Sequence, residues 1–119
     1  MSKKIILIGE NEGIISLDLR IFLEKNYFSS KIVRSGSELI KQYKVDKPDL
    51  IITDLNLPGK VTVEEALREI NRLDSTPVII LSGFSKSKIE KFSNSLSHSS
   101  FLIKPYDKKE LLVLIRKYI

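Results

Sequence analysis

Polar residues that suit metal or phosphate chemistry stand directly after four apolar segments of this sequence. They comprise acids, an amide, a hydroxyl and a lysine: Glu10, Asn11, Glu12, Asp54, Ser82 and Lys104. Carboxylate oxygens of Glu10 and Asp54, with a carbonyl from the loop after Asp54, form an open set of hard ligands suited to Mg²⁺. Lys104 and Ser82 suit the remaining oxygens of a phosphoryl group. Together these side chains fit phosphoryl transfer to Asp54, which needs mainly positioning and charge stabilisation.

Each of these residues also has an ordinary structural interpretation. An aspartate after a strand often caps a turn, as Asp54 can in the loop that contains Asn56. Ser82 can cap the following helix. Glu12 suits a helix start because its negative charge is attracted to the positive end of the helix dipole. Lys104 can be a plain surface charge. The chemical interpretation therefore depends on whether the fold brings these residues to one place.

Short apolar runs rich in β-branched residues alternate with segments of helical period. The expected strands are Ile5–Ile8, Lys31–Val33, Leu50–Thr53, Pro77–Leu81 and Phe101–Ile103. Apolar residues at helical spacing indicate five helices, marked by Ile14, Leu17, Ile21, Phe22 and Leu23; Leu39, Ile40 and Tyr43; Ala66, Leu67, Ile70 and Leu73; Ile89, Phe92 and Leu96; and Leu111, Leu112, Leu114, Ile115 and Tyr118. This order predicts a single α/β domain over residues 1–119, with a parallel sheet covered on both faces. In such sheets the ligand site lies beyond the carboxyl ends of the strands, where the polar residues stand.

Local signals predict where two helices begin and which helix is weak. Ser35 followed by Glu38 predicts a capping box, and Asp107 followed by Glu110 predicts the start of the last helix. The serines between Ser93 and Ser100 predict a weak fourth helix, because serine is a poor helix former.

Composition excludes several classes of protein. The 119 residues contain no cysteine and one histidine, His98, so disulfides, thiolate sites and sites with two imidazoles are ruled out. No apolar run approaches the ~20 residues that span a bilayer. The apolar run near the start of the chain, Ile5–Ile8, is too short for the core of a signal peptide. We therefore expect a cytoplasmic protein without membrane contact. The net charge of +5 arises from lysines scattered among acids, which favours a solvated surface over direct nucleic-acid binding.

Four segments of the chain resemble the response-regulator receiver domain of two-component signalling. They are Ile5–Glu12, Pro48–Gly59, Pro77–Ser82 and Phe101–Tyr106. The resemblance covers nearly the whole chain and implies a flavodoxin-like, doubly wound five-stranded parallel sheet of order 2-1-3-4-5 with five helices. It implies a phosphoacceptor of a two-component system or phosphorelay. Such a domain takes a phosphoryl group from a histidine kinase or phosphotransfer protein and then changes its binding to a downstream target or output domain.

The resemblance also implies a Mg²⁺ site and a phosphoacceptor. Asp54 accepts the phosphoryl group, and Lys104 contacts it. The Mg²⁺ ligands come from Glu10, Asn11, Asp54 and the backbone carbonyl of Asn56.

A switch is implied by the same resemblance. Ser82 moves toward the phosphoryl group, and the ring of Phe101 turns inward as that hydroxyl moves. The fourth helix, fifth strand and fifth helix form the surface for a partner, which includes a possible homodimer. The peptide bond between Lys104 and Pro105 is expected to be cis.

The chain departs from the family at Asn11, where a second carboxylate is usual. The loss of this negative charge predicts weak Mg²⁺ binding without loss of phosphorylation. Thr62-Val63 replaces a common Asp-Gly, which predicts a different entry to the third helix. Phe84, two residues after Ser82, is either surface packing or a screen against attacking water.

Two functions remain after this comparison, and a third fits poorly. The first is an active receiver, which is no turnover enzyme but catalyses its own phosphorylation and slow dephosphorylation. The second, motivated by Asn11, is a degenerate receiver that binds partners without phosphorylation. A flavin-binding domain needs a phosphate-cradling loop after the first strand, and Gly9-Glu10-Asn11-Glu12 would repel a phosphate. The chain ends where its last helix does, so it is either a stand-alone domain or a fragment of a longer protein.

Overall fold

A computed structural model describes residues 3–83 and 85–119 of the chain. Strands and helices alternate strictly, in the order β1 (Ile5–Gly9), α1 (Gly13–Lys25), β2 (Ser29–Val33), α2 (Gly36–Asp46), β3 (Leu50–Asp54), α3 (Val63–Leu73), β4 (Val78–Ser82), α4 (Lys86–Ser93), β5 (Ser99–Ile103) and α5 (Lys108–Tyr118). Among the described helices, none combines the length and apolar character needed to cross a membrane.

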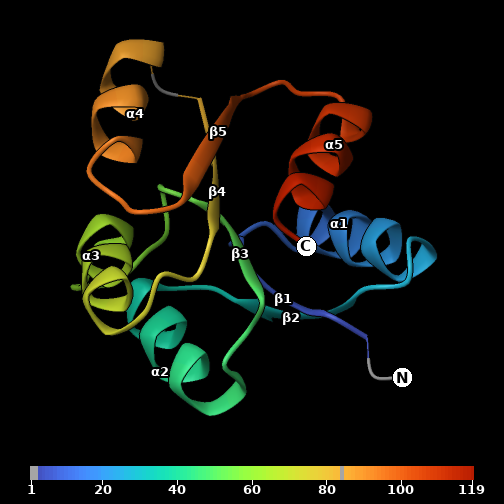
Figure 1. The fold of residues 1–119 in the computed structure, drawn as a ribbon, viewed down its shortest axis with the longest axis horizontal. Helices are drawn as coiled ribbons and strands as arrows, with labels where there is room; N and C mark the ends of the chain where they lie inside the picture. The colour runs from blue at the N-terminus through green and yellow to red at the C-terminus, as the bar shows by residue number, and fades with distance from the viewer. Residues whose placement is uncertain (1–2, 84) are drawn as a thin grey trace.

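The five strands form one parallel sheet in the order β2-β1-β3-β4-β5, which confirms the predicted fold (Figure 1). The helices α1 and α5 cover one face, and α2, α3 and α4 cover the other. In the register, Gly9 at the end of β1 pairs with Thr53, and Asp54 pairs with Leu81 of β4. All strand carboxyl ends therefore lie at one edge of the sheet.

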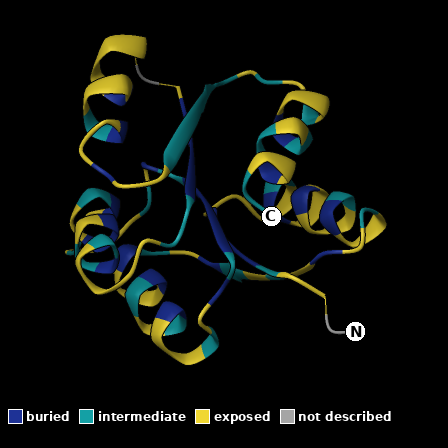
Figure 2. Cartoon of the chain, in the orientation of Figure 1, coloured by how far each residue is buried: buried dark blue, intermediate teal, exposed yellow. Residues whose placement is uncertain are grey.

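A separate hydrophobic core supports each face of the sheet. Successive strand residues point to opposite faces, so Leu7 and Ile51 belong to one core while Ile6 and Ile52 belong to the other. All four are fully buried. Figure 2 shows the buried residues concentrated in the central strands and on the inner faces of the helices. This packing explains why β1, β3 and β4 read as continuous apolar runs in the sequence.

The exposed face of α1 is a correction to the sequence-based expectation. Ile14, Leu17 and Ile21 mark the helical period, but their exposed fractions are 87%, 55% and 45%. The core contacts come from Leu19 and Leu23, with Phe22 packed against the same cluster; of these, Phe22 and Leu23 were among the expected residues and Leu19 was not. Both rows have helical spacing, so periodicity alone could not choose between them, and the packing of the helix on the sheet did.

Several predicted boundaries are wrong, among them the start of β5, which lies at Ser99, two residues earlier than expected. The strand β2 begins at Ser29, two residues earlier than expected, because edge pairing with β1 continues to Ser29 opposite Ile5. The helix α4 ends at Ser93, so Leu96 lies beyond it, although Leu96 is buried in the core. A chain segment after the helix thus supplies an apolar contact that the sequence pattern had assigned to the helix itself.

Helix starts are stabilised largely by side-chain caps. The Oγ of Ser35 accepts a hydrogen bond from the Glu38 backbone at 3.2 Å, and Asp107 accepts one from the Lys109 backbone at 2.8 Å. A full capping box, missed in the sequence, begins α3: Thr62 accepts from the Glu65 backbone, and the Glu65 carboxylate accepts from Thr62. This box explains how α3 begins without the Asp-Gly pair common in the family.

The serine-rich segment is held to its surroundings by hydroxyl hydrogen bonds. Ser99 Oγ donates to the Ser93 carbonyl oxygen at 2.6 Å, which links β5 to the end of α4. On the other side of the strand, the hydroxyls of Ser100 and Tyr118 lie 2.5 Å apart and link β5 to α5. The predicted weakness of α4 concerns helix propensity and remains a prediction.

Gly36 and Gly13, each the first residue of a helix, form a matched pair for a stability test. A Cβ on Gly36 would lie 2.4 Å from the backbone oxygen of Val61, whereas a Cβ on Gly13 would meet no described atom within 4 Å. We expect Gly36→Ala to lower the free energy of unfolding by about 2 kcal/mol, because rigid backbone must move. Gly13→Ala should leave it unchanged or raise it slightly. Urea denaturation measures both, and equal effects would contradict the close packing of α2 on the α3 entry loop.

Candidate functional site

A cleft opens at the edge of the sheet where the strands end. Its volume is about 340 Å³, and its lining residues are Glu12, Asp54, Asn56, Ser82, Gly83 and Lys104. Four of the six polar residues singled out in the sequence, Glu12, Asp54, Ser82 and Lys104, line this one cleft, and Glu10 and Asn11 are not among its lining residues. A larger hollow of about 500 Å³, beside Ile40 and Arg68, lies away from these residues.

Asp54 is the central acceptor in the cleft. The ammonium group of Lys104 donates a hydrogen bond to its Oδ2, and the backbone N–H of Asn56 donates to its Oδ1 at 2.9 Å. The turn-capping role and the ion pair therefore coexist on the two oxygens of one carboxylate. Each contact orients the group, and together they fix how it faces the cleft.

Glu10 provides a second carboxylate that is almost completely buried, with 3% of its side chain exposed. Its Oε1 accepts a hydrogen bond from the Glu12 backbone at 3.2 Å, while Oε2 has no hydrogen-bond partner among the described residues. The Lys104 Nζ lies 4.0 Å from Oε2. Burial raises the pKa of Glu10, and the Glu12 hydrogen bond and the Lys104 charge offset only part of that effect. A buried oxygen without a donor is a place where a cation fits.

Lys104 is the positive centre between the two acids. Burial by itself would lower its pKa, but the hydrogen bond and charge of Asp54, with the charge of Glu10, outweigh burial and raise the pKa. Nearby, burial followed by the charges of Glu10, Asp18 and Asp54 raises the pKa of Tyr106 to about 12. Lys104 thus remains charged, and Tyr106 remains protonated, at neutral pH.

Close packing between β1 and β3 sets the separation of the two acids. A Cβ on Gly9 would lie 2.0 Å from the Thr53 Oγ1, so only glycine permits this approach. The Thr53 hydroxyl is buried and donates to the Asp54 carbonyl oxygen at 2.9 Å. Glu10 and Asp54 follow directly after this contact in each strand, so their positions depend on it.

The remaining predicted residues lie near the cleft in different environments. Ser82 is 1% exposed at the end of β4, and the half-buried Phe101 packs against the core on the α2–α3–α4 face. The peptide bond between Lys104 and Pro105 is cis, as expected. Phe84 lies outside the described residues.

One of the capping alternatives is wrong, and the other holds only in part. Glu12 occupies the N-cap position of α1, but its side chain makes no capping hydrogen bond. The N-cap of α4 is Ser85, so Ser82 does not cap that helix. Ser82 thus has no role in starting a helix, while Glu12 keeps its position at the positive end of the α1 dipole without a side-chain capping bond.

The donor set fits a cation incompletely. Within residues 3–83 and 85–119, no group of three or more His, Cys, Asp or Glu side chains is assembled for a metal ion. Position 11, next to Glu10, is an exposed asparagine and brings no third carboxylate. Glu10 and Asp54 supply two charged ligands, and neutral oxygens of Asn11 and Asn56 would have to complete the set. This fits Mg²⁺ held by few charges.

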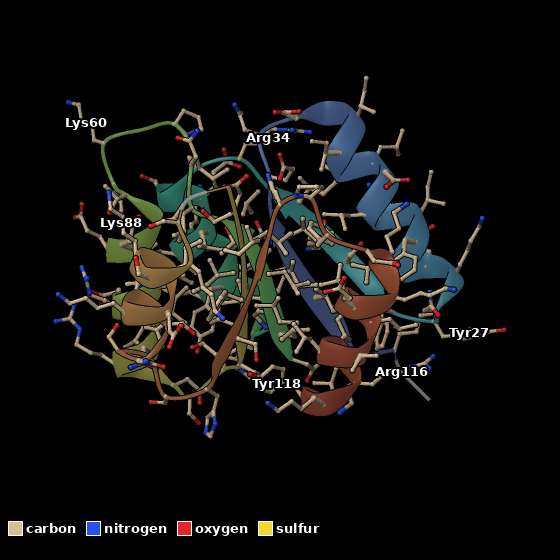
Figure 3. All side chains as sticks on the ribbon, turned by 90° about the horizontal axis from the view of Figure 1, so that it is seen from above. Tyr27, Arg34, Lys60, Lys88, Arg116 and Tyr118 are labelled. Atoms are coloured by element: carbon tan, nitrogen blue, oxygen red, sulfur yellow. The ribbon has the colours of Figure 1, made fainter. Side chains whose placement is uncertain are left out.

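Arg34 belongs to the rim but was missed in the sequence. It directly follows β2, and its Nη1 lies 3.5 Å from the backbone oxygens of both Glu10 and Asn11. Figure 3 labels Arg34 close to the start of α1. The available signal was its position after an edge strand beside β1, where strand carboxyl ends meet.

Comparison with known proteins decides the family. A family model described as "Response regulator receiver domain" matches residues 6–116. The chain belongs to this family. Receiver domains are modules of two-component response regulators, which work with histidine kinases and output domains.

Curated relatives of this receiver are regulators of about twice its length. PdtaR of Mycobacterium tuberculosis, named a transcriptional regulatory protein, is 28% identical over 111 residues, which cover 92% of this chain and 54% of PdtaR. The ycf29 protein of Porphyra purpurea is 32% identical over 123 residues, which cover 100% of this chain and 57% of that protein. The chain therefore spans about half the length of the curated relatives it matches.

Solved structures agree with the receiver fold. A receiver domain protein of Methanospirillum hungatei has a TM-score of 0.87 at 23% identity, covering 98% of this chain and 93% of that one. The receiver domain of the sensor histidine kinase PA1611 of Pseudomonas aeruginosa has a TM-score of 0.85 at 19% identity, covering 98% of this chain and 97% of that one. That structure is described with magnesium in its active site cleft.

The unpartnered oxygen of Glu10 predicts a pH-dependent effect of Glu10→Gln on stability. The folded-state pKa of Glu10 lies above its unfolded value of 4.5, so ionising it costs stability as pH rises through the interval between the two values. With divalent cations chelated, we expect the variant to be about 1 kcal/mol more stable than wild type at neutral pH. The difference should vanish below the unfolded pKa, where the carboxyl group is protonated in both states.

Urea denaturation over a pH series checks this expectation. Glu90→Gln, at an exposed position on α4, is the matched control and should change stability little at any pH. A wild type more stable than Glu10→Gln at neutral pH would contradict the stated cost of the buried carboxylate.

Proposed function

We propose that this receiver accepts a phosphoryl group on Asp54 and then changes its affinity for a partner protein. The observation that carries the proposal is the placement of Asp54 at the cleft with the Lys104 ammonium on one carboxylate oxygen. Lys104 is the only protein cation among the cleft-lining residues, so it is the group available to neutralise an incoming phosphoryl oxygen.

The reaction transfers one phosphoryl group between two nucleophiles. A carboxylate oxygen of Asp54 attacks the phosphorus of a phosphohistidine, the new P–O bond forms as the P–N bond breaks, and the departing imidazole takes up a proton. Lys104 compensates the charge that builds on the phosphoryl oxygens, and the Ser82 hydroxyl donates to one of them. Water slowly hydrolyses the acyl phosphate, which releases inorganic phosphate and restores the Asp54 carboxylate. The protein is thus a switch rather than a turnover enzyme.

Mg²⁺ is the cofactor that the family and the donor set suggest. Glu10, Asn11, Asp54 and the backbone carbonyl of Asn56 would hold it, and when bound it supplies positive charge to the phosphoryl oxygens. The magnesium described in the PA1611 receiver supports this assignment. Because Asn11 removes one carboxylate from the set, we propose that the affinity for Mg²⁺ is weak.

The proposed reaction implies two kinds of partner, one that donates the phosphoryl group and one that responds to the phosphorylated form. The phosphodonor is a histidine kinase or phosphotransfer protein, in the cytoplasm where ATP supplies phosphoryl groups. The phosphorylated form signals through Ser82, Phe101 and the face made by α4, β5 and α5, to a target protein, an output domain or a second copy. Direct contact with nucleic acid or membrane has no part in this proposal.

The apolar row on α1 is suited to the phosphodonor. Ile14, Leu17 and Ile21 form an exposed row whose first member lies two residues from the cleft residue Glu12. A donor that brings a histidine to Asp54 must cover this rim of the cleft, and the row offers it apolar surface to bury. We therefore place the donor on α1.

The alternative is a degenerate receiver that binds partners without being phosphorylated. Asn11 is the observation that favours it, because a site with fewer acids holds Mg²⁺ less well. The presence of Asp54, Ser82 and Lys104 in one cleft favours the active receiver instead. A labelling experiment separates the two.

Incubation with acetyl phosphate and saturating Mg²⁺ should add one phosphoryl group to the wild type, seen by intact mass and lost on treatment with hydroxylamine. Asp54→Asn should abolish the addition, because the nucleophile is gone. Asp74→Asn, at the exposed aspartate that follows α3, is the control and should be labelled normally. An unlabelled wild type would support the degenerate alternative, and labelling that persists in Asp54→Asn would place the chemistry elsewhere.

A charge placed in the apolar row of α1 should slow phosphoryl transfer from protein donors but not labelling by small phosphodonors. We expect Leu17→Glu to slow phosphoryl transfer from a histidine kinase or phosphotransfer protein by about tenfold or more, because it buries a charge at the contact. Labelling by acetyl phosphate, which needs no docking surface, should not change. Leu73→Glu, with 56% exposure against 55% for Leu17, is the matched control. Equal slowing by both variants would remove α1 as the donor surface.

A further inference from the structure

Arg34 lies beside the loop that carries the acids of the site. Its Nη1 is 3.5 Å from the backbone oxygens of Glu10 and of Asn11, and its side chain is exposed. At this distance the contacts are long for hydrogen bonds and act mainly as charge–dipole interactions. A full positive charge therefore stands at the rim, next to two of the residues assigned to hold Mg²⁺.

The loop does not need Arg34 to keep its shape. The Glu10 backbone N–H donates to the Val33 oxygen at 3.0 Å, and the Ser16 backbone N–H donates to the Glu12 oxygen at 2.9 Å. Glu10 Oε1 also accepts from the Glu12 backbone. These shorter bonds fix the loop at both ends, so the contribution of Arg34 is its charge.

The charge inventory of the site is unusual for one that takes a divalent cation. Glu10 and Asp54 bring two negative charges to the assigned ligands, and Lys104 contacts both. With Arg34 included, the two positive charges of the protein equal the two negative charges of the ligands. The exposed Glu12 is the remaining acid at the rim. A divalent cation entering this site meets little net negative charge.

We propose that Arg34 is a built-in counter-charge that lowers the affinity of this site for Mg²⁺. It acts with Asn11, since one removes a negative charge and the other adds a positive one. The site would then fill with Mg²⁺ only at high concentration, so that phosphoryl acceptance follows the supply of the cation. This inference rests on the proposed function, in which Glu10 and Asp54 hold the cation.

The test is a Mg²⁺ titration of the unphosphorylated protein, followed by amide NMR shifts around the cleft. At low ionic strength, we expect Arg34→Gln to bind Mg²⁺ about fivefold more tightly than wild type, because a positive charge near the ion is removed. The gain should shrink with added KCl, since exposed charges are screened. A role limited to holding the loop predicts the opposite sign, with weaker binding in Arg34→Gln.

Three further variants complete the design. Arg34→Lys keeps the charge and should retain the wild-type affinity, whereas Asn11→Asp adds a carboxylate and should bind more tightly than either. Lys25→Gln makes the same charge change at the opposite end of α1 and should have no effect at the cleft.

The outcomes distinguish this inference from the proposed function. Unchanged or weaker Mg²⁺ binding in Arg34→Gln, with tighter binding in Asn11→Asp, would overturn the role of Arg34 and leave the Mg²⁺ site in place. No binding by any variant, Asn11→Asp included, would overturn the Mg²⁺ site and this inference with it. Labelling of Asp54 is measured separately, so its failure would be recognised independently.

Discussion

The contact between Lys104 and Asp54 is the interaction on which the site depends, and it exists because the sheet is parallel. β3 and β5 lie on either side of β4, and parallel order brings their carboxyl ends to the same edge. Glu10 arrives at that edge from β1, held at a set distance by the approach of Gly9 to Thr53. Lys104 and Asp54 are 50 residues apart in the sequence, and the parallel order of the strands brings them into contact.

The same site carries a stability cost that the rest of the fold must offset. Glu10 is buried with one oxygen lacking a hydrogen-bond donor among the described residues, and desolvation of a charged group is unfavourable. Two apolar cores on opposite faces of the sheet hold β1 and β3 rigidly enough to keep the acid there. Receivers belong to a fold whose ligand site lies beyond the carboxyl ends of the strands, where such polar groups stand.

Three surface features of this receiver lie on different elements: the apolar row on α1, the hydroxyl contacts of β5, and Arg34 after β2. The apolar row on α1 leads away from the cleft, whereas the hydroxyl contacts of Ser99 and Ser100 tie β5 to α4 on one side and α5 on the other. The charge of Arg34 lies beside the loop that leads into α1, 3.5 Å from the backbone oxygens of Glu10 and Asn11. The proposed donor surface and the proposed counter-charge therefore both adjoin the start of α1, whereas the proposed output face is made by α4, β5 and α5.

The sequence by itself determined the alternation of strands and helices, and with it the edge at which Glu10, Asp54, Ser82 and Lys104 stand, because hydrophobic period and caps are local properties of the chain. The family resemblance supplied the order of the strands. Tertiary structure alone decided which of two apolar rows of α1 faces the sheet, and that Leu96 packs from beyond α4. It also placed Arg34 beside the acids. These features depend on contacts between elements distant in sequence, for which a local pattern carries no signal.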